Sequence, residues 1–522
     1  MSNHADIPRH VYKKGLKHSS VMAVCTLIRG ILAFVPVILI AKKIGLGNIT
    51  DAYLMAYAIN QIILKFLRVG TLPKVFTMVL SRDFVASRKK TEENINNLFN
   101  IFLIFSFLAM ACVYILAPLL VNIIAKGFDP DKKIMTINIV RLLAPLFFYQ
   151  IIMSLCDSVF KLSSEFSRWA ILSVVSPLII FLFVVFSISS LGIYSMVCGT
   201  LAGCFVHILL LIYYVRFKLN YPYRFSLDFK NKLVREIPVL LYPYYLSSLP
   251  VQFMLGIQSF LVSLLAPGVA SVYFYVLRIQ DYVEEYTINI FSEITFPFFL
   301  KKMAASSLDA IKKVYVQLIC FPNYAFLPVL IILAVFGSQI THILFRSKFT
   351  DSSILSLLGA AFSWVMFFYL PEPSNNMQFS VILAMKKTGW VNLVNISRMI
   401  LVILLSLILF KYFKFWGIIF SYSLTSLQGF LINQWHLRRK YSFENIFVNP
   451  RFLKIIFLNI LLALFCLCFK YQVTRNFVFN GTYQNILVTS IASVMSIIFY
   501  GLMSYLFKCE ELKIIFGLVR KT

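Results

Sequence analysis

Apolar runs of about 20 residues, the length that crosses the hydrocarbon core of a bilayer, recur from one end of the chain to the other. Polar segments separate the runs, and none of these connections is long enough to form a soluble domain. The pattern predicts an all-α polytopic membrane protein with about fourteen transmembrane helices. The runs cover residues 20–41, 51–80, 98–125, 134–162, 171–189, 193–215, 237–265, 269–300, 314–345, 354–385, 391–410, 416–437, 453–469 and 486–507.

Basic residues inside these runs give the first indication of function. A cation at bilayer depth is costly, and it normally faces a bundle interior or a water-filled cavity. We therefore expect the protein to handle an anionic ligand. Lys65 and Arg68 lie close to one membrane face, so snorkelling to the surface is the alternative for them. The basic residues in the runs are Arg29, Lys65, Arg68, Arg141, Arg278 and Arg398.

The eighth run carries a polar stripe. Arg278, Asp281, Glu285, Asn289 and Glu293 follow one another at i, i+3, i+7, i+11 and i+15, a spacing that places them on one face of a helix. The stripe is either a buried ion-pair ladder that locks helices together or the lining of a cavity. We favour the cavity, because charge at this depth is expensive and is usually functional.

The tenth run is interrupted by two prolines. Pro371 and Pro373 flank Glu372 and are expected to break the helix, which leaves a carboxylate at the break. A hinge that moves during the working cycle and a simple kink are equally compatible with this pattern.

Composition and charge agree with a membrane protein. The chain is 60% hydrophobic and 13% charged, so a water-soluble domain of this composition would have too few polar residues to form its surface. Its net charge of +28 does not indicate nucleic-acid binding, because Lys and Arg alternate with the spans rather than gather on one module. With a cytoplasmic N-terminus, the basic residues concentrate in cytoplasmic segments, as the positive-inside rule requires. Both termini are then cytoplasmic, and anionic lipid headgroups are the expected neighbours.

Motifs for catalysis and metal binding are missing from the sequence. It contains no glycine-rich phosphate loop, HExxH motif or nucleophile elbow, so an enzyme is not expected. The nine cysteines form no CxxC pair, and we expect no metal and no cofactor. His207 stands alone in its run and is expected to hydrogen-bond within the bundle.

Two sequence motifs recur about 220 residues apart, or six spans. Residues 47–53 are echoed by 268–273, and residues 123–129 by 343–351. Since six is an even number, the two halves have the same orientation, as in parallel repeats with a substrate path between them. The predicted organisation is one lobe in residues 1–225, a second in 226–445 and a two-helix appendage in 446–522.

The same motifs resemble a known family. Gly45–Tyr53 is similar to the G-x-G-x-x-T-D-A-F region of the MurJ/MviN-type lipid II flippases, and residues 126–129 resemble their "pGFD" loop. Residues 271–278 resemble the S-x-x-Y-Y-A-D-R segment of their eighth helix, and residues 343–351 resemble their "LFxrGxFt" loop. The resemblance implies two six-helix lobes that work by alternating access, with two final helices that form a groove for lipid tails.

The resemblance also suggests roles for individual residues. Arg278 matches a cavity arginine, Asp281 the acidic residue one turn later, and Asp51 the aspartate of the first motif. Arg29 and Lys65 match basic residues of the first and second helices. We expect the following residues to bind the substrate pyrophosphate: Arg29, Lys65, Arg68 and Arg278. The expected acidic or gating residues of the cavity are Asp51, Asp281, Glu285 and Glu293.

The family implies a flippase that moves undecaprenyl-pyrophosphate-linked lipid II to the outer leaflet of the bacterial inner membrane during peptidoglycan synthesis. Two departures leave alternatives open. Pro36 and Val37 replace an Arg-Asp pair of the family, and Leu277 replaces the Asp before the eighth-helix Arg. A flippase for O-antigen or capsule lipid-linked oligosaccharides is therefore the near rival, and a multidrug exporter of the same superfamily is the more distant one. The protein is expected to be monomeric and to work beside cell-wall synthesis enzymes.

Overall fold

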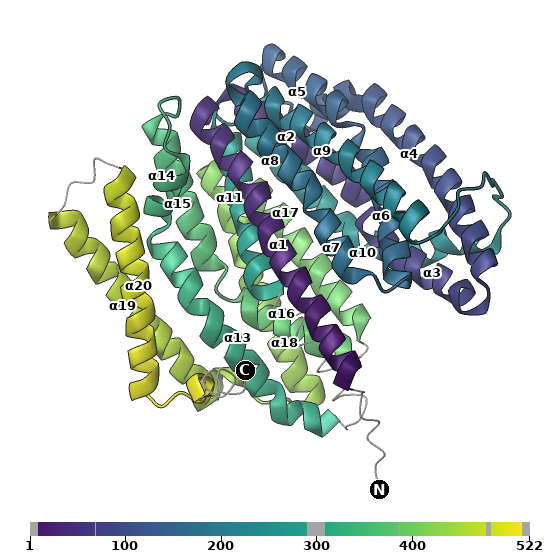
Figure 1. Cartoon of the computed structure of the whole chain (residues 1–522). Helices are drawn as coiled ribbons and strands as arrows, with labels where there is room; N and C mark the ends of the chain where they lie inside the picture. The colour runs from purple at the N-terminus through teal and green to yellow at the C-terminus, as the bar shows by residue number, and fades with distance from the viewer. Residues whose placement is uncertain (1–8, 68, 290–307, 386, 477–481, 514–522) are drawn as a thin grey trace, which may run out of the picture. The chain divides into compact units, whose positions relative to one another are not determined.

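The computed structural model describes residues 9–67, 69–289, 308–385, 387–476 and 482–513. Helices make up nearly all of this part of the chain (Figure 1). Within it, 10 helices are long and apolar enough to cross a membrane, or up to 11 when a bent pair counts as one span. The prediction of an all-helical polytopic membrane protein is confirmed. The chain divides into two compact units, Met1–Leu264 and Leu265–Thr522.

The first unit is an all-helical bundle. Its helix α10 packs against α2, α3 and α4, and α1 packs against α7 and α8. This compact unit therefore extends one helix beyond residue 225, where the sequence places the end of the first lobe. The helices of the unit are α1 (Arg9–Ile44), α2 (Asn48–Phe66), α3 (Leu72–Ala86), α4 (Arg88–Ile124), α5 (Pro130–Leu143), α6 (Leu146–Leu162), α7 (Phe166–Ser173), α8 (Val175–Leu191), α9 (Tyr194–Tyr213) and α10 (Lys232–Ser263).

The second predicted span is not one continuous helix. The run at 51–80 divides into α2 and α3, with a short 3₁₀ turn at Val69–Thr71 between them. Pro73 lies in the first turn of α3, where its missing N–H leaves no hydrogen bond unmade, whereas inside a longer helix it would remove one. The break places the end of α2, with Lys65 in its last turn, at a helix terminus.

The second unit is built around α13, which packs against α15, α16 and α19. The hairpin of α19 and α20 lies against α13 and α14 (Figure 1). The helices of the unit are α11 (Val269–Glu284), α13 (Leu308–Val335), α14 (Gly337–Phe345), α15 (Ser352–Phe368), α16 (Glu372–Ala384), α17 (Thr388–Phe413), α18 (Phe415–Tyr441), α19 (Pro450–Asn476) and α20 (Thr482–Leu506).

The predicted helix break at the two prolines is confirmed. Helices α15 and α16 meet at a bend of 43°. Pro371 directly precedes α16 and Pro373 occupies its first turn, positions that proline tolerates because N–H groups there have no intrahelical partner. The bend places Tyr369 at the end of α15 and Glu372 at the start of α16.

The recurring motifs occupy equivalent local positions. Gly47 and Gly268 directly precede α2 and α11. Asp129 and Asp351 cap α5 and α15, and each carboxylate accepts a backbone hydrogen bond of 2.9 Å. Such caps satisfy amide groups that have no partner at the start of a helix. The repeated sequence thus marks helix starts in both units.

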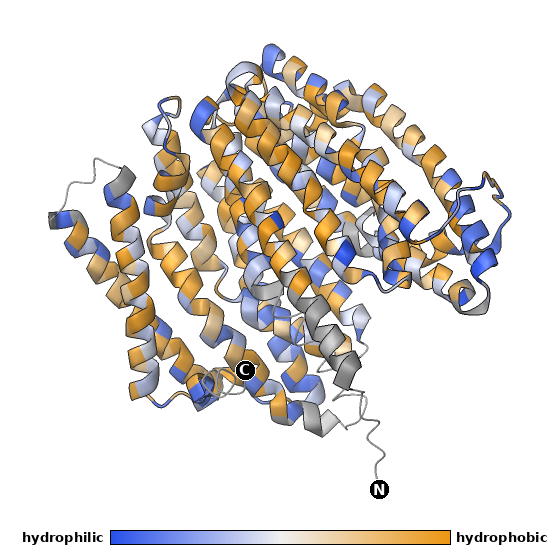
Figure 2. Ribbon diagram, viewed as in Figure 1, coloured by the Kyte–Doolittle hydropathy of each residue, from blue (hydrophilic) through white to orange (hydrophobic). Residues whose placement is uncertain are grey.

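Apolar residues cover most of the helix surfaces in each unit, while polar residues collect near helix ends and in connections (Figure 2). Large side chains on the outward faces are well exposed, for example Ile115 at 70%, Phe186 at 82% and Leu487 at 61%. A protein in water would bury such residues, whereas hydrocarbon accommodates them without cost. The surface therefore fits a lipid environment.

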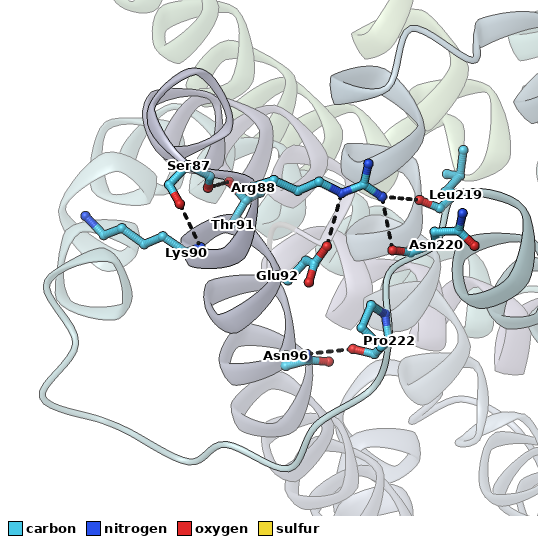
Figure 3. A network of polar contacts seen from close by, with 9 residues as sticks. All are labelled: Ser87, Arg88, Lys90, Thr91, Glu92, Asn96, Leu219, Asn220 and Pro222. Carbon is cyan, nitrogen blue, oxygen red and sulfur yellow. Dashed lines mark hydrogen bonds and ion pairs between the residues drawn. The ribbon is translucent and has the colours of Figure 1, made fainter.

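A row of asparagines on α4 holds the linker that leads to α10. Asn97 accepts a hydrogen bond from the Asp228 amide at 2.6 Å and donates one to the Asp228 carbonyl at 2.9 Å. Arg88 donates to the carbonyls of Leu219 and Asn220, each at 3.2 Å, as Figure 3 shows. We call this row the linker clamp. It consists of Asn94, Asn96, Asn97 and Asn100, each hydrogen-bonded to the segment 222–231.

Candidate functional site: charged side chains in the membrane helices

Arg29 lies on α1 in the middle of an apolar sequence, and its side chain is half-buried. It lies within electrostatic range of Tyr149 on α6. The Tyr149 hydroxyl is in turn 2.9 Å from Nδ1 of His207, which confirms the expected hydrogen bond of His207 within the bundle. Arg29 therefore lies on the side of α1 that is near the Tyr149–His207 pair of the first unit.

Lys65 occupies the last turn of α2, and its side chain is exposed. A cation near a helix C-terminus also interacts favourably with the helix dipole. Arg68, the other basic residue predicted for this helix, lies outside the described residues.

Asp51 is fully buried in the first turn of α2. Its Oδ2 accepts a hydrogen bond of 2.6 Å from the ammonium of Lys132 on α5, which is also nearly buried. This ion pair ties two helices of the first unit together, so the position of Asp51 favours a structural role. The sequence did not suggest Lys132 as a partner, because the two residues lie far apart along the chain.

The polar stripe of the eighth span is placed on α11 and the turn after it. Arg278 is half-buried, Asp281 is exposed and Glu285 is half-buried. The predicted α-helical spacing does not continue to Asn289, because Glu285–Asn289 form a π turn, which changes the number of residues per turn. Glu293 lies outside the described residues.

A buried cluster of polar side chains in the second unit was only partly expected. Arg398 of α17 donates a hydrogen bond of 2.5 Å to Glu372 at the start of α16, so the carboxylate at the helix break has a cationic partner. Glu284, at the end of α11, lies in the same cluster. The sequence singled out Glu372 and Arg398 separately but passed over Glu284, which lies beside the stripe rather than on it.

An apolar cavity of about 850 Å³ lies in the second unit among α13, α15, α16, α18 and α19. Its polar groups include Asn323, Asn459 and Lys470. The Lys470 ammonium donates a hydrogen bond of 2.6 Å to the carbonyl of Val335. The volume and lining suit a flexible hydrocarbon chain. The apolar lining residues include Leu327, Ile331, Phe367, Leu427, Phe452, Ile456, Ile460, Ala463 and Leu467.

The sequence profile of the family described as "Lipid II flippase MurJ" matches residues 40–506 of this chain. The chain belongs to the MurJ lipid II flippase family. This is a family of transporters rather than enzymes, as the sequence predicted. Two curated relatives, both named "Probable lipid II flippase MurJ", come from Buchnera aphidicola. One is 26% identical over 64% of this chain and 66% of its own length, and the other 24% identical over 81% of this chain and 84% of its own length.

Solved structures support the same fold. The chain is similar to the lipid II flippase MurJ in its inward closed conformation, with a TM-score of 0.72 and 17% identity over 93% of this chain and 98% of that one. It also resembles an inward-facing multidrug-resistance transporter of the MATE family, within the MOP superfamily, with a TM-score of 0.65 and 15% identity over 80% of this chain and 94% of that one. At this level of identity the likeness concerns the fold alone.

Proposed function

We propose that this protein moves lipid II from the cytoplasmic to the periplasmic leaflet by alternating access, in the synthesis of peptidoglycan. The observation that carries the proposal is the placement of Arg29 and Arg278, two half-buried arginines in apolar helices, in a chain of this family. The substrate carries a pyrophosphate, which does not cross hydrocarbon unaided. Arginine is suited to it because its planar fork binds phosphate oxygens in pairs.

The headgroup is held by the basic residues of α1, α2 and α11. In this proposal Arg29, Lys65, Arg68 and Arg278 bind the pyrophosphate. Their attraction is strong where water is excluded, since the effective dielectric constant is low. Carboxylates nearby compete for the same cations as the substrate leaves, which gives the protein a means of release. The competing carboxylates are Asp281, Glu285 and Glu293, while Asp51 fixes the start of α2 through its ion pair with Lys132.

The lipid tail lies in the apolar cavity beside α19. A polyisoprenyl chain stays in hydrocarbon while its headgroup passes through the protein, so a groove open to lipid suits it. The mostly apolar lining and the volume of about 850 Å³ support this placement. Lys470 stands towards the C-terminal end of α19, where a charged group suits the membrane surface.

We propose the following architecture around these helices. About fourteen spans form two parallel six-helix lobes, residues 1–225 and 226–445, with residues 446–522 as the appended pair. The excess of Lys and Arg between spans supports cytoplasmic termini in the bacterial inner membrane. Anionic lipids and cell-wall synthesis enzymes are the expected neighbours of a monomer.

Reporter fusions test the proposed topology. Fusions after Leu80 and Tyr223 should read cytoplasmic, and a fusion after Lys132 should read periplasmic.

A flippase for O-antigen or capsule lipid intermediates is the second candidate. It is favoured by Pro36, Val37 and Leu277, which stand where the family carries charged residues. These substitutions remove charges expected to contact the headgroup, but they leave the pyrophosphate-binding arginines in place. A multidrug exporter fits less well, since such proteins prefer cations, whereas the basic residues of α1 and α2 favour an anionic substrate.

Complementation distinguishes these candidates. The chain is expressed in cells depleted of their own lipid II flippase, and in cells that lack an O-antigen flippase. Growth and normal shape in the first strain, with no rescue in the second, is the expected result. Rescue of the second strain alone would indicate that the substrate is the O-antigen intermediate rather than lipid II. Arg278→Ala serves as the matched negative control, with its membrane level measured by immunoblot.

A further inference from the structure

The second unit contains a fixed ion pair at the bend between α15 and α16. Arg398 and Glu372 are 2.5 Å apart, and their side chains are only 16% and 10% exposed. Glu372 also accepts hydrogen bonds from Asn375 at 2.7 Å and from Ser426 at 3.2 Å. Gly429 lets Arg398 pass closely, since a Cβ at this position would lie 3.1 Å from the arginine Cδ. The charge of Glu372 is therefore compensated and held in place.

Glu284 brings a second carboxylate to this pair. It lies within electrostatic range of Tyr369, Glu372 and Arg398. Tyr369 itself is 3% exposed. When both carboxylates are ionised they share one guanidinium, and the group carries an excess negative charge. Excess charge among buried helices is costly, and taking up one proton removes it.

A separate observation comes from Gln280, one turn before Glu284. The side chain is 1% exposed, and its amide nitrogen donates to the Tyr422 hydroxyl at 3.1 Å. Its carbonyl oxygen is buried and accepts no hydrogen bond from the described residues. Residues at i and i+4 share a helix face. The O–H group of a protonated Glu284 would therefore lie on the same face of α11 as the unpartnered carbonyl oxygen of Gln280.

We propose that Glu284 is the proton-binding site of this protein, where one proton is taken up and released in each transport cycle. The carboxylate gains a proton from water on one side of the membrane and returns it on the other, and no other bond changes. This inference rests on the proposed transport function. It adds that the ion coupled to transport is a proton. The titratable and charged groups that face Glu284 are Asp281 of α11, Tyr369 of α15, Glu372 of α16, Arg398 of α17 and Tyr422 of α18.

The position of the site links protonation to movement. Tyr369, which lies within electrostatic range of Glu284, caps the end of α15, whereas Glu372 begins α16 on the other side of the 43° bend. A proton on Glu284 removes its attraction to Arg398 and its repulsion of Glu372. The balance of forces across the bend therefore differs between the two protonation states, which is what a coupled conformational change requires.

The first test needs no lipid substrate. Infrared difference spectra of the full chain in proteoliposomes are recorded between alkaline and acidic pH. We expect a carboxylic-acid carbonyl band that is lost in Glu284→Gln, shifted in Tyr369→Phe and unchanged in Glu444→Gln, a variant of an exposed glutamate. The Tyr369→Phe variant keeps the test decisive if Glu284→Gln folds poorly. A band that persists unchanged in both variants of the cluster would overturn the proposal, whether or not the protein transports lipid II.

The second test depends on substrate binding. If one proton is linked to lipid II, the dissociation constant changes by up to about tenfold per pH unit in the wild type. Glu284→Gln is expected to abolish this slope, while Glu444→Gln retains it. A wild type that binds lipid II with no pH slope, or one whose flipping follows a sodium gradient but not a proton gradient, contradicts the proton site. A wild type that fails to bind lipid II contradicts the proposed function instead, and the infrared result still decides the proton site.

Discussion

The Nζ atom of Lys132 lies 2.6 Å from Oδ2 of Asp51, and the two side chains are only 6% and 0% exposed. The pair joins the first turns of α2 and α5, two helix starts that carry motifs of the family resemblance. The ammonium also lies 4.0 Å from the ring centre of Phe128 in the second of these motifs. The similarity to lipid II flippases thus rests partly on residues that hold the first unit together.

Removal of Lys132 should destabilise the first unit. Lys132→Met leaves the Asp51 charge buried without its partner, which typically costs about 3–5 kcal/mol. The double variant Asp51→Asn/Lys132→Met should recover much of this loss. Thermal unfolding of the purified protein in detergent measures the difference. Lys126→Met, at an exposed position before the same helix, is the control. Equal melting temperatures for the two single variants would show that the ion pair contributes nothing.

The linker clamp should protect the segment before α10 from proteolysis. Asn97→Ala removes two hydrogen bonds to the backbone of Asp228, each worth about 0.5–1.5 kcal/mol. Limited trypsin digestion should then cut at Arg224 or Lys230 several-fold faster. Asn122→Ala, an exposed asparagine of the same helix, should digest like the wild type. No change in the cleavage rate of Asn97→Ala would contradict a clamp.

The spans and helix starts could be predicted from sequence because they depend on local pattern. Apolar length marks a span, and motifs such as Asp129-Pro130 mark a helix start. Asp51 and Lys132 are 81 positions apart, and Asn97 and Asp228 are 131 apart, so no local pattern joins them. Glu284 was passed over for a related reason. Its neighbours come from α15, α16 and α17, which are far from it in the sequence. In addition, the polar stripe was predicted from regular α-helical spacing, and the π turn that follows Glu284 interrupts this spacing.

Arg278 and Arg398 should behave differently when replaced by alanine. Arg278→Ala should abolish complementation at normal protein levels, because charge-assisted contacts worth about 1.5–3 kcal/mol are lost. Arg398→Ala should lower the protein level in the membrane, since it leaves the buried Glu372 without its cation. Complementation and quantitative immunoblots measure the two effects. If both variants lose only a little complementation and a little protein, and do so equally, the charged face of α11 has only a structural role.

The apolar cavity can be filled by mutation to test its role as the tail site. Ala463 lines the cavity, whereas the next residue, Leu464, is 53% exposed on the outside of α19. Ala463→Trp should reduce lipid II binding at least several-fold because the indole occupies the space of the tail. Leu464→Trp should bind as the wild type does. Native mass spectrometry of both variants with lipid II gives the comparison, and equal binding would place the tail elsewhere.

The central claim is that cations in α1, α2 and α11 bind the pyrophosphate of a lipid-linked glycan. Native mass spectrometry of the purified chain with lipid II, undecaprenyl phosphate and a neutral lipid tests it most directly, with the triple variant Arg29→Gln/Lys65→Gln/Arg278→Gln beside the wild type. We predict that the wild type binds lipid II, that undecaprenyl phosphate competes and the neutral lipid does not, and that the triple variant loses binding by at least about a hundredfold, or 2.7 kcal/mol. Normal lipid II binding by the triple variant, or equal competition by the neutral lipid, would contradict the account.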